Sequence, residues 1–102
     1  MTRETLDLKI RHLLDEILVM DRMVENAVID SMDALKRRDL GAARRVYKDD
    51  RDVNEKRFEI ENECLITIAT QQPLARDLRT IASILEVAGE HDRDKFTIYL
   101  VV

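Results

Sequence analysis

The sequence has 102 residues, of which 45% are hydrophobic and 37% charged, and its formal net charge is −4. This length and mixture predict one small globular domain and exclude a disordered chain, which would be short of apolar residues. The net negative charge argues against nucleic acid as a partner, because a protein that holds phosphates needs a basic surface.

The chain contains a single cysteine, Cys64, so it cannot form an internal disulfide, and a reducing compartment fits best. No apolar stretch typical of a signal peptide follows the first residues. No apolar run approaches the ~20 residues that a membrane-spanning helix needs. We therefore expect a cytoplasmic protein without membrane insertion.

The first predicted element is one long helix over residues 2–38, which Thr2 or Thr5 can cap. Its apolar residues recur at alternating steps of four and three, which places them on one helical stripe. The stripe consists of Leu6, Ile10, Leu13, Ile17, Met20, Val24 and Ala27, and continues as Val28, Ser31 or Met32, and Leu35. Four arginines around the end of this helix, Arg37, Arg38, Arg44 and Arg45, are interpreted as a solvated helix end.

The second predicted helix runs from about Ala42 to Thr70, with Asp39 as its N-cap. Its apolar line is Ala43, Val46, Val53, Ile60, Cys64 and Ile68, widened on one flank by Phe58 and Leu65. Asp50 and Arg57 interrupt this line, so both are expected to point inward or to lie near the seam.

The third predicted helix begins at Pro73, because proline is well tolerated in the first turn of a helix and ends the helix before it. Its apolar line is Leu74, Leu78, Ile81, Leu85 and Ala88. From Glu90 the chain becomes a charge run, followed at residues 96–102 by a β-prone uncharged run without a strand partner. We expect residues 1–90 to form the domain and residues 91–102 to be a divergent C-terminal tail.

Three long helices joined by short loops must run antiparallel to their neighbours. The sequence therefore predicts an all-α, up-down-up three-helix bundle. Because the third helix is the shortest, it leaves part of the seam between the other two uncovered. A homodimer or larger oligomer would cover that seam.

The residues offer little for catalysis. Neither His12 nor His91 has a serine or cysteine placed beside it, and Gly41 and Gly89 are isolated, so no glycine-rich phosphate loop is present. No catalytic residue is assigned, and we expect that the protein is not an enzyme.

Carboxylates are the more informative group. Two oxygen ligands spaced i, i+4 share a helix face, and two such helices can hold a hard or borderline cation between them. The candidate metal ligands are Asp50 with Asn54 on the second helix, and Glu86, Glu90 and Asp92 on the third. The alternative is a solvated acidic face, although Asp50 and Asp92 fall on the apolar lines and so must be paired, hydrated or metal-bound.

Two motifs resemble the PhoU family. The first is Arg51-Asp52-Val53-Asn54; the second and more specific, at residues 71–79, reads Gln-Gln-Pro-Leu-Ala-Arg-Asp-Leu-Arg. The resemblance covers about residues 3–90 and implies a three-helix repeat, which full members carry twice. It also implies negative regulation of phosphate uptake and phosphate-starvation signalling. The implied partners are the ATPase subunit of the phosphate ABC transporter and its sensor histidine kinase, and homodimers are common.

The resemblance also implies multinuclear metal sites, with Fe, Zn, Mn or Mg as the candidate ions. Asp50 and Asn54 match the family motif on the second helix, and Asp92 matches on the third, where Phe96 stands in place of the distal aspartate. We therefore expect a truncated or frame-altered copy of the repeat. The alternatives to a regulator are a carboxylate metal-binding helical protein and a purely structural bundle that dimerises.

Overall fold

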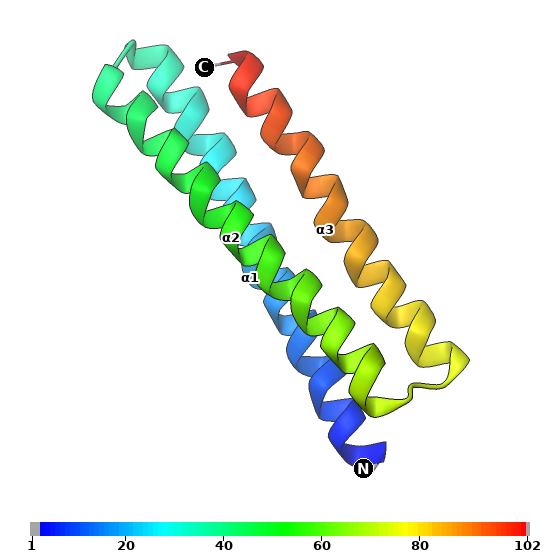
Figure 1. Cartoon of the computed structure of the whole chain (residues 1–102). Helices are drawn as coiled ribbons and strands as arrows, with labels where there is room; N and C mark the ends of the chain where they lie inside the picture. The colour runs from blue at the N-terminus through cyan, green and yellow to red at the C-terminus, as the bar shows by residue number, and fades with distance from the viewer. Residues whose placement is uncertain (1–2, 102) are drawn as a thin grey trace.

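The computed structural model describes the backbone of residues 3–101 and the side chains of residues 3–90. Three helices, α1 (Arg3–Arg37), α2 (Leu40–Gln71) and α3 (Ala75–Val101), run up, down and up along one another (Figure 1). Residues 3–101 contain no strand. The predicted all-α three-helix bundle is confirmed.

The molecule is a rod with principal extents of 53 × 17 × 16 Å. At ~1.5 Å per residue, a helix as long as α1 spans ~50 Å, so α1 sets the length of the rod. The radius of gyration is 16.3 Å, whereas a compact domain of this length has about 13 Å. A rod exposes more surface than a sphere of the same volume. Within the described part of the chain no helix is long and apolar enough to cross a bilayer.

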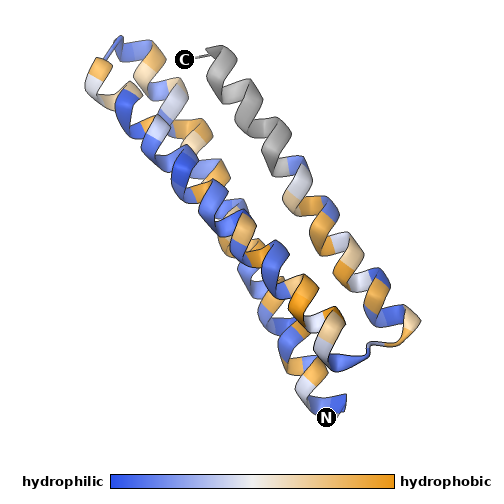
Figure 2. Cartoon of the chain, viewed as in Figure 1, coloured by the Kyte–Doolittle hydropathy of each residue, from blue (hydrophilic) through white to orange (hydrophobic). Residues whose placement is uncertain are grey.

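One apolar core runs through the middle of the rod, with three buried residues from each helix. Apolar and polar segments alternate along the coloured part of each helix, as expected when one side of each helix is buried (Figure 2). The core consists of Leu13, Met20 and Val24 from α1, Val53, Ile60 and Cys64 from α2, and Ile81, Ile84 and Ala88 from α3.

The predicted stripes of α1 and α2 are confirmed in the centre and wrong near one end of each helix. In α1, Ser31 and Ala34 are buried, whereas Leu35 is 54% exposed. In α2, Thr67 is buried and Ile68 is 36% exposed. The buried residues keep a seven-residue spacing along each helix: Leu6, Leu13, Met20, Ala27 and Ala34 on α1, and Val46, Val53, Ile60 and Thr67 on α2. The predicted positions Leu35 and Ile68 each lie one residue after the buried one.

The flank predicted on α2 is also wrong. Phe58 is 54% exposed and Leu65 is 61% exposed. The guanidinium of Arg57 lies 4.8 Å from the centre of the Phe58 ring, within the range of a cation–π contact. The half-buried Arg57 thus lies near the seam, as predicted, and covers one face of an aromatic ring that faces solvent.

The α1–α2 turn consists of Arg38 and Asp39. Arg38 has φ 51°, and the backbone N–H groups of Arg38 and Asp39 donate to the carbonyls of Leu35 and Ala34. This is the Schellman pattern that ends many helices. The Asp39 side chain accepts hydrogen bonds from the backbone N–H groups of Gly41 and Ala42, which confirms it as the N-cap of α2.

Helix α3 begins two residues later than predicted, at Ala75. The Asp77 side chain accepts a hydrogen bond from the backbone N–H of Leu74 at 3.0 Å and so caps the first turn. This places Asp77 on the buried side with Ile81 and Ile84, whereas Leu74 and Leu78, which were predicted to be buried, are exposed.

Helix α3 continues through residues 91–101. Residues 96–101 of the β-prone run are therefore helical, although their composition favours a strand. A lone strand would leave its backbone groups unpaired, whereas a helix pairs them within the segment. The side chains of residues 91–102 lie outside the described part. The boundary at residue 90 stays a prediction.

Candidate functional site

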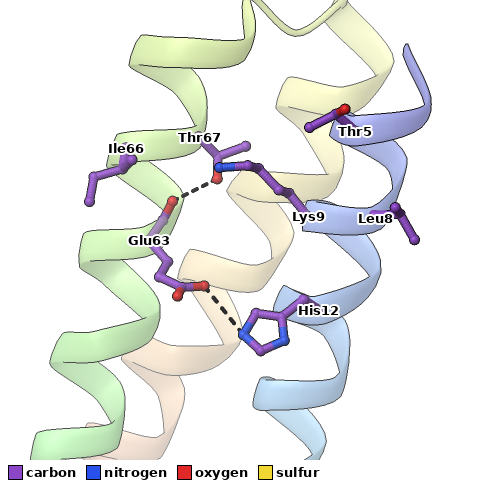
Figure 3. A pocket seen from close by; sticks show the side chains of 7 residues that line it. All are labelled: Thr5, Leu8, Lys9, His12, Glu63, Ile66 and Thr67. Atoms are coloured by element: carbon purple, nitrogen blue, oxygen red, sulfur yellow. Dashed lines mark hydrogen bonds and ion pairs between the residues drawn. The ribbon is translucent and has the colours of Figure 1, made fainter. Parts of the chain in front are cut away.

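Two hollows of the described surface lie in a groove between α1 and α2. At the end near the start of α1, a hollow of about 330 Å³ is lined by Thr5, Leu8, Lys9, His12, Glu63, Ile66 and Thr67 (Figure 3). The first four come from α1 and the others from α2. They face one another because α1 and α2 are antiparallel.

The polar groups of this hollow are only partly paired. His12 Nε2 lies 3.6 Å from Glu63 Oε2, an ion pair when the imidazole is protonated. The Thr67 hydroxyl donates to the backbone carbonyl of Glu63 at 2.8 Å. The half-buried Lys9 makes no ion pair with any other residue among those described. The hollow therefore combines the Lys9 ammonium with the apolar side chains of Leu8 and Ile66.

The middle of the groove is closed by an ion pair between Lys56 and Glu16. Both side chains are about four-fifths buried, at 20% and 22% exposure. The hydrogen bond to Glu16 raises the pKa of the Lys56 ammonium, although burial acts in the opposite direction. This pair joins α2 to α1 and separates the two ends of the groove.

The far end of the groove holds a carboxyl pair. A second hollow, of about 310 Å³, is lined by Asp30, Asp33, Ala42, Arg45, Lys48 and Asp49. Burial raises the pKa of the Asp49 carboxyl, and its hydrogen bond to Asp30 raises it further. A carboxyl pair of this kind favours a shared proton over two negative charges.

The lining of the first hollow offers groups that can bind a partner. The hydroxyls that line its first hollow belong to Thr5 and Thr67, and the His12 imidazole faces the Glu63 carboxylate. What the lining offers is charge, hydrogen bonds and apolar area.

An ion pair at one end of the rod joins α1 to α3. Both guanidinium Nη atoms of Arg3 donate to the Asp77 carboxylate, a bidentate arrangement. The Asp77 side chain is 5% exposed. Its hydrogen bonds from Arg3 hold the pKa of Asp77 below its usual range, although burial acts in the opposite direction.

The predicted metal ligands lie on two helices, and the described ones do not form a donor set. Asp50 and Asn54 are half-buried one turn apart on α2, and Glu86 and Glu90 are exposed on α3. The Asn54 side-chain oxygen accepts a hydrogen bond from Arg57 at 2.8 Å, so a cationic side chain occupies it. Among the residues with described side chains, no three His, Cys, Asp or Glu side chains lie close enough to hold an ion. The side chain of Asp92 lies outside that part, and metal binding stays a prediction.

Sequence reasoning missed the residues that the tertiary structure pairs. Asp77 stands three residues after Leu74, the spacing of an N-terminal capping carboxylate, and this signal could have placed it. Thr5, Lys9 and His12 follow one another at helical steps on α1, which shows a shared face. Nothing in the sequence indicates that Glu63, Ile66 and Thr67 on α2 lie opposite them, because only the packing of the two helices brings the two sets together.

The comparisons with known proteins agree on one family. The family model described as PhoU domain matches residues 17–93. A phosphate-specific transport system accessory protein PhoU homolog of a Burkholderia species is 34% identical over 87 residues, which are 85% of this chain and 37% of that protein. The homolog of Clostridium acetobutylicum is 34% identical over 94 residues, or 91% of this chain and 43% of that protein.

The accessory protein PhoU of Escherichia coli is 33% identical over 78 residues, or 76% of this chain and 32% of that protein. The chain thus aligns with well under half the length of these relatives. No solved structure matches it. The family match covers most of the three helices that build the core, and on this evidence the chain belongs to the PhoU domain family.

Proposed function

We propose that the protein is a regulator of phosphate uptake and phosphate-starvation signalling. It acts negatively, through the ATPase subunit of the phosphate ABC transporter and the sensor histidine kinase. The observation that carries this proposal is the PhoU domain match over residues 17–93. The relatives named above are accessory proteins of the phosphate-specific transport system.

We also propose that the chain is an interaction module of the cytoplasm and not an enzyme. The hollows of the α1–α2 groove offer charged and apolar side chains without an activated nucleophile. Regulation by contact needs only complementary surfaces, and a rod with two long helical faces provides them.

The function is tested in a bacterial strain that lacks its own PhoU protein and carries a phosphate-starvation reporter. Expression of the chain should lower the reporter signal in high phosphate. Each proposed partner, purified with an affinity tag, should retain the chain. An unchanged reporter together with no retention by either partner would exclude the proposal.

We also propose a homodimer. The accessible surface of the chain is 7148 Å², whereas a compact monomer of this mass has about 5,900 Å². The excess exceeds the ~800 Å² that each partner buries in a standard interface. Exposed apolar residues on α1, among them Leu18 and Met32, could form such an interface.

A further inference from the structure

The side of α1 that points away from the core carries a second regular stripe of residues. Leu18 stands two residues before the buried Met20, and two positions turn a helical side chain by about 200°. Leu18 therefore points away from the bundle. The stripe through it recurs at alternating steps of three and four residues, and we call it the outer stripe. It consists of Leu8, Arg11, Asp15, Leu18, Arg22, Glu25, Ile29 and Met32, all of them exposed.

Apolar residues stand at the middle and at both ends of the outer stripe. Leu8, Leu18, Ile29 and Met32 are each more than half exposed. Steps of three and four are the spacing with which two helices pack side by side along a seam. The outer stripe thus has the periodicity of a helix–helix interface, although no helix of the described structure covers it.

The four charged residues of the outer stripe have no ion-pair partner among residues 3–90, whose side chains the structure describes. This holds for Arg11, Asp15, Arg22 and Glu25. At the border of the stripe, Asp7 is already paired with Arg3 at 3.1 Å, and Asp21 is half-buried. The charges that are exposed and unpaired on this side of α1 are therefore those of the stripe itself.

The order of these charges is complementary to itself when the stripe is turned end for end. Arg11 lies seven residues before Leu18, and Glu25 lies seven residues after it. Asp15 lies three residues before Leu18, and Arg22 lies four residues after it. A second α1, packed antiparallel about a two-fold axis at Leu18, would place Glu25 of the partner subunit opposite Arg11. The same axis would place Arg22 of the partner subunit opposite Asp15.

A parallel pairing of two outer stripes lacks this match. With the two-fold axis along the rod, every residue meets its own counterpart, so arginine faces arginine at Arg11 and glutamate faces glutamate at Glu25. Like charges placed against each other disfavour an arrangement. The charges of the outer stripe therefore select the antiparallel orientation.

We propose that the outer stripe is the interface of the homodimer, in which a second copy of the chain packs antiparallel on α1 with Leu18 at the two-fold axis. An isologous interface uses the same surface on both subunits, so that surface must be complementary to itself, as the outer stripe is. The apolar residues supply the buried area. The ion pairs add little affinity at an exposed rim and chiefly set the orientation.

The inference rests on the homodimer proposed above and adds to it the contact surface and the orientation. Charge reversal tests both. In a dimer of Arg11→Glu chains, each new carboxylate faces Glu25 of the partner subunit. Analytical ultracentrifugation should therefore show the dimer dissociation constant raised by about tenfold. Glu25→Arg should raise it by a similar factor, because each new guanidinium faces Arg11 of the partner subunit.

The two substitutions together should restore the dimer. In the chain with both Arg11→Glu and Glu25→Arg, each carboxylate again faces a guanidinium, so the dissociation constant should return close to the natural value. An equimolar mixture of the two single variants should form mixed dimers for the same reason. A tagged Arg11→Glu chain should therefore retain untagged Glu25→Arg chains better than untagged Arg11→Glu chains.

The matched control makes the same changes of charge on another helix. Arg79→Glu and Glu86→Arg alter exposed sites of α3, outside the proposed interface. Each should leave the dissociation constant within about twofold of the natural value. A control that weakens the dimer as much as Arg11→Glu would overturn the proposed interface.

Two further results would overturn the interface while the homodimer itself stands. One is a natural dimer that neither Arg11→Glu nor Glu25→Arg weakens. The other is a pair of weakened variants that neither the mixture nor the double substitution restores. A monomeric natural chain would overturn the interface and the homodimer together. The proposed regulation is measured separately by the reporter assay, so its failure would be distinguished from all of these results.

Discussion

Asp30 and Asp49 place two carboxyl groups against each other across the α1–α2 groove. Burial of Asp49 and its hydrogen bond to Asp30 raise the pKa of the Asp49 carboxyl. The ionised form is therefore disfavoured in the folded protein, and this lowers stability as pH rises from the ordinary aspartate pKa, about 4, through the raised value.

The substitution Asp49→Asn removes that cost. The amide can still donate to Asp30, so we expect the variant to be more stable at neutral pH by about 0.5 kcal/mol, the size of like-charge effects on helix surfaces. The gain should vanish near pH 3, where the Asp49 carboxyl is protonated in both the folded and the unfolded state. Thermal unfolding followed by circular dichroism at both pH values checks this, and an unchanged or lower midpoint at pH 7 would contradict it.

Cys64 is a core residue and a poor nucleophile in the folded protein. It is fully buried, and burial, with smaller contributions from Glu63 and Glu61, raises the pKa of its thiol to about 11. The thiolate is the reactive form.

We therefore expect iodoacetamide to modify native Cys64 at pH 8 at least ~100-fold more slowly than in urea. Mass spectrometry of quenched samples measures both rates. Similar rates in the two conditions would show that Cys64 is accessible in the folded chain.

At the scale of the helices, residues of the same type differ in how far they are buried. Leu13 and Leu14 are neighbours of the same type on α1, but Leu13 is fully buried and Leu14 is 43% exposed. Leu13 contributes to the core shared by all three helices.

Leu13→Ala should lower the free energy of unfolding by about 2–5 kcal/mol, because it removes buried methyl groups and leaves a cavity. The matched control Leu14→Ala should cost less than about 1 kcal/mol, since much of its side chain remains in water. Urea denaturation of both variants measures the difference. Equal losses would mean that α1 is rotated relative to the structure described.

Helices α1 and α3 are also joined by the bidentate pair of Arg3 and Asp77. The lowered pKa of Asp77 means that its carboxylate stabilises the fold above about pH 4, and that this stability is lost as pH falls through the lowered value.

Asp77→Asn should therefore lower the thermal midpoint at pH 7, and the difference should shrink toward pH 2. The control is Asp7→Asn, because Asp7 also pairs with Arg3, at 3.1 Å, but is 55% exposed. An exposed pair contributes little, so the control should change the midpoint less at pH 7. Equal midpoints for the natural chain and Asp77→Asn at pH 7 would show that the pair does not hold α3.

At the scale of the whole molecule, the rod shape leaves apolar surface exposed that a second copy of the chain could cover. The rod exposes more area than a compact protein of its mass, and apolar residues such as Leu18, at 59%, lie on it. These observations support the proposed homodimer.

Light scattering on the purified chain should give a mass of twice 11.9 kDa at micromolar concentration. Leu18→Glu should shift the protein toward the monomer, because a charge replaces an apolar contact in the interface. A monomeric mass for the natural chain would exclude the dimer.

The sequence by itself determined the three helices, their antiparallel order, the Asp39 cap and the central stripes. Each of these depends on residues within one or two turns of one another, which periodicity and capping rules describe.

Only the tertiary structure decided which polar residues meet. Arg3 and Asp77 are 74 positions apart, and Asp30 and Asp49, or His12 and Glu63, lie on different helices. These pairs depend on the rotation of each helix about its axis and on its stagger against its neighbours. An error of one residue turns a helical side chain by about 100°, as Leu35 and Ile68 illustrate. The packing of the three helices against one another fixes these rotations. The periodic pattern of a single helix does not determine them.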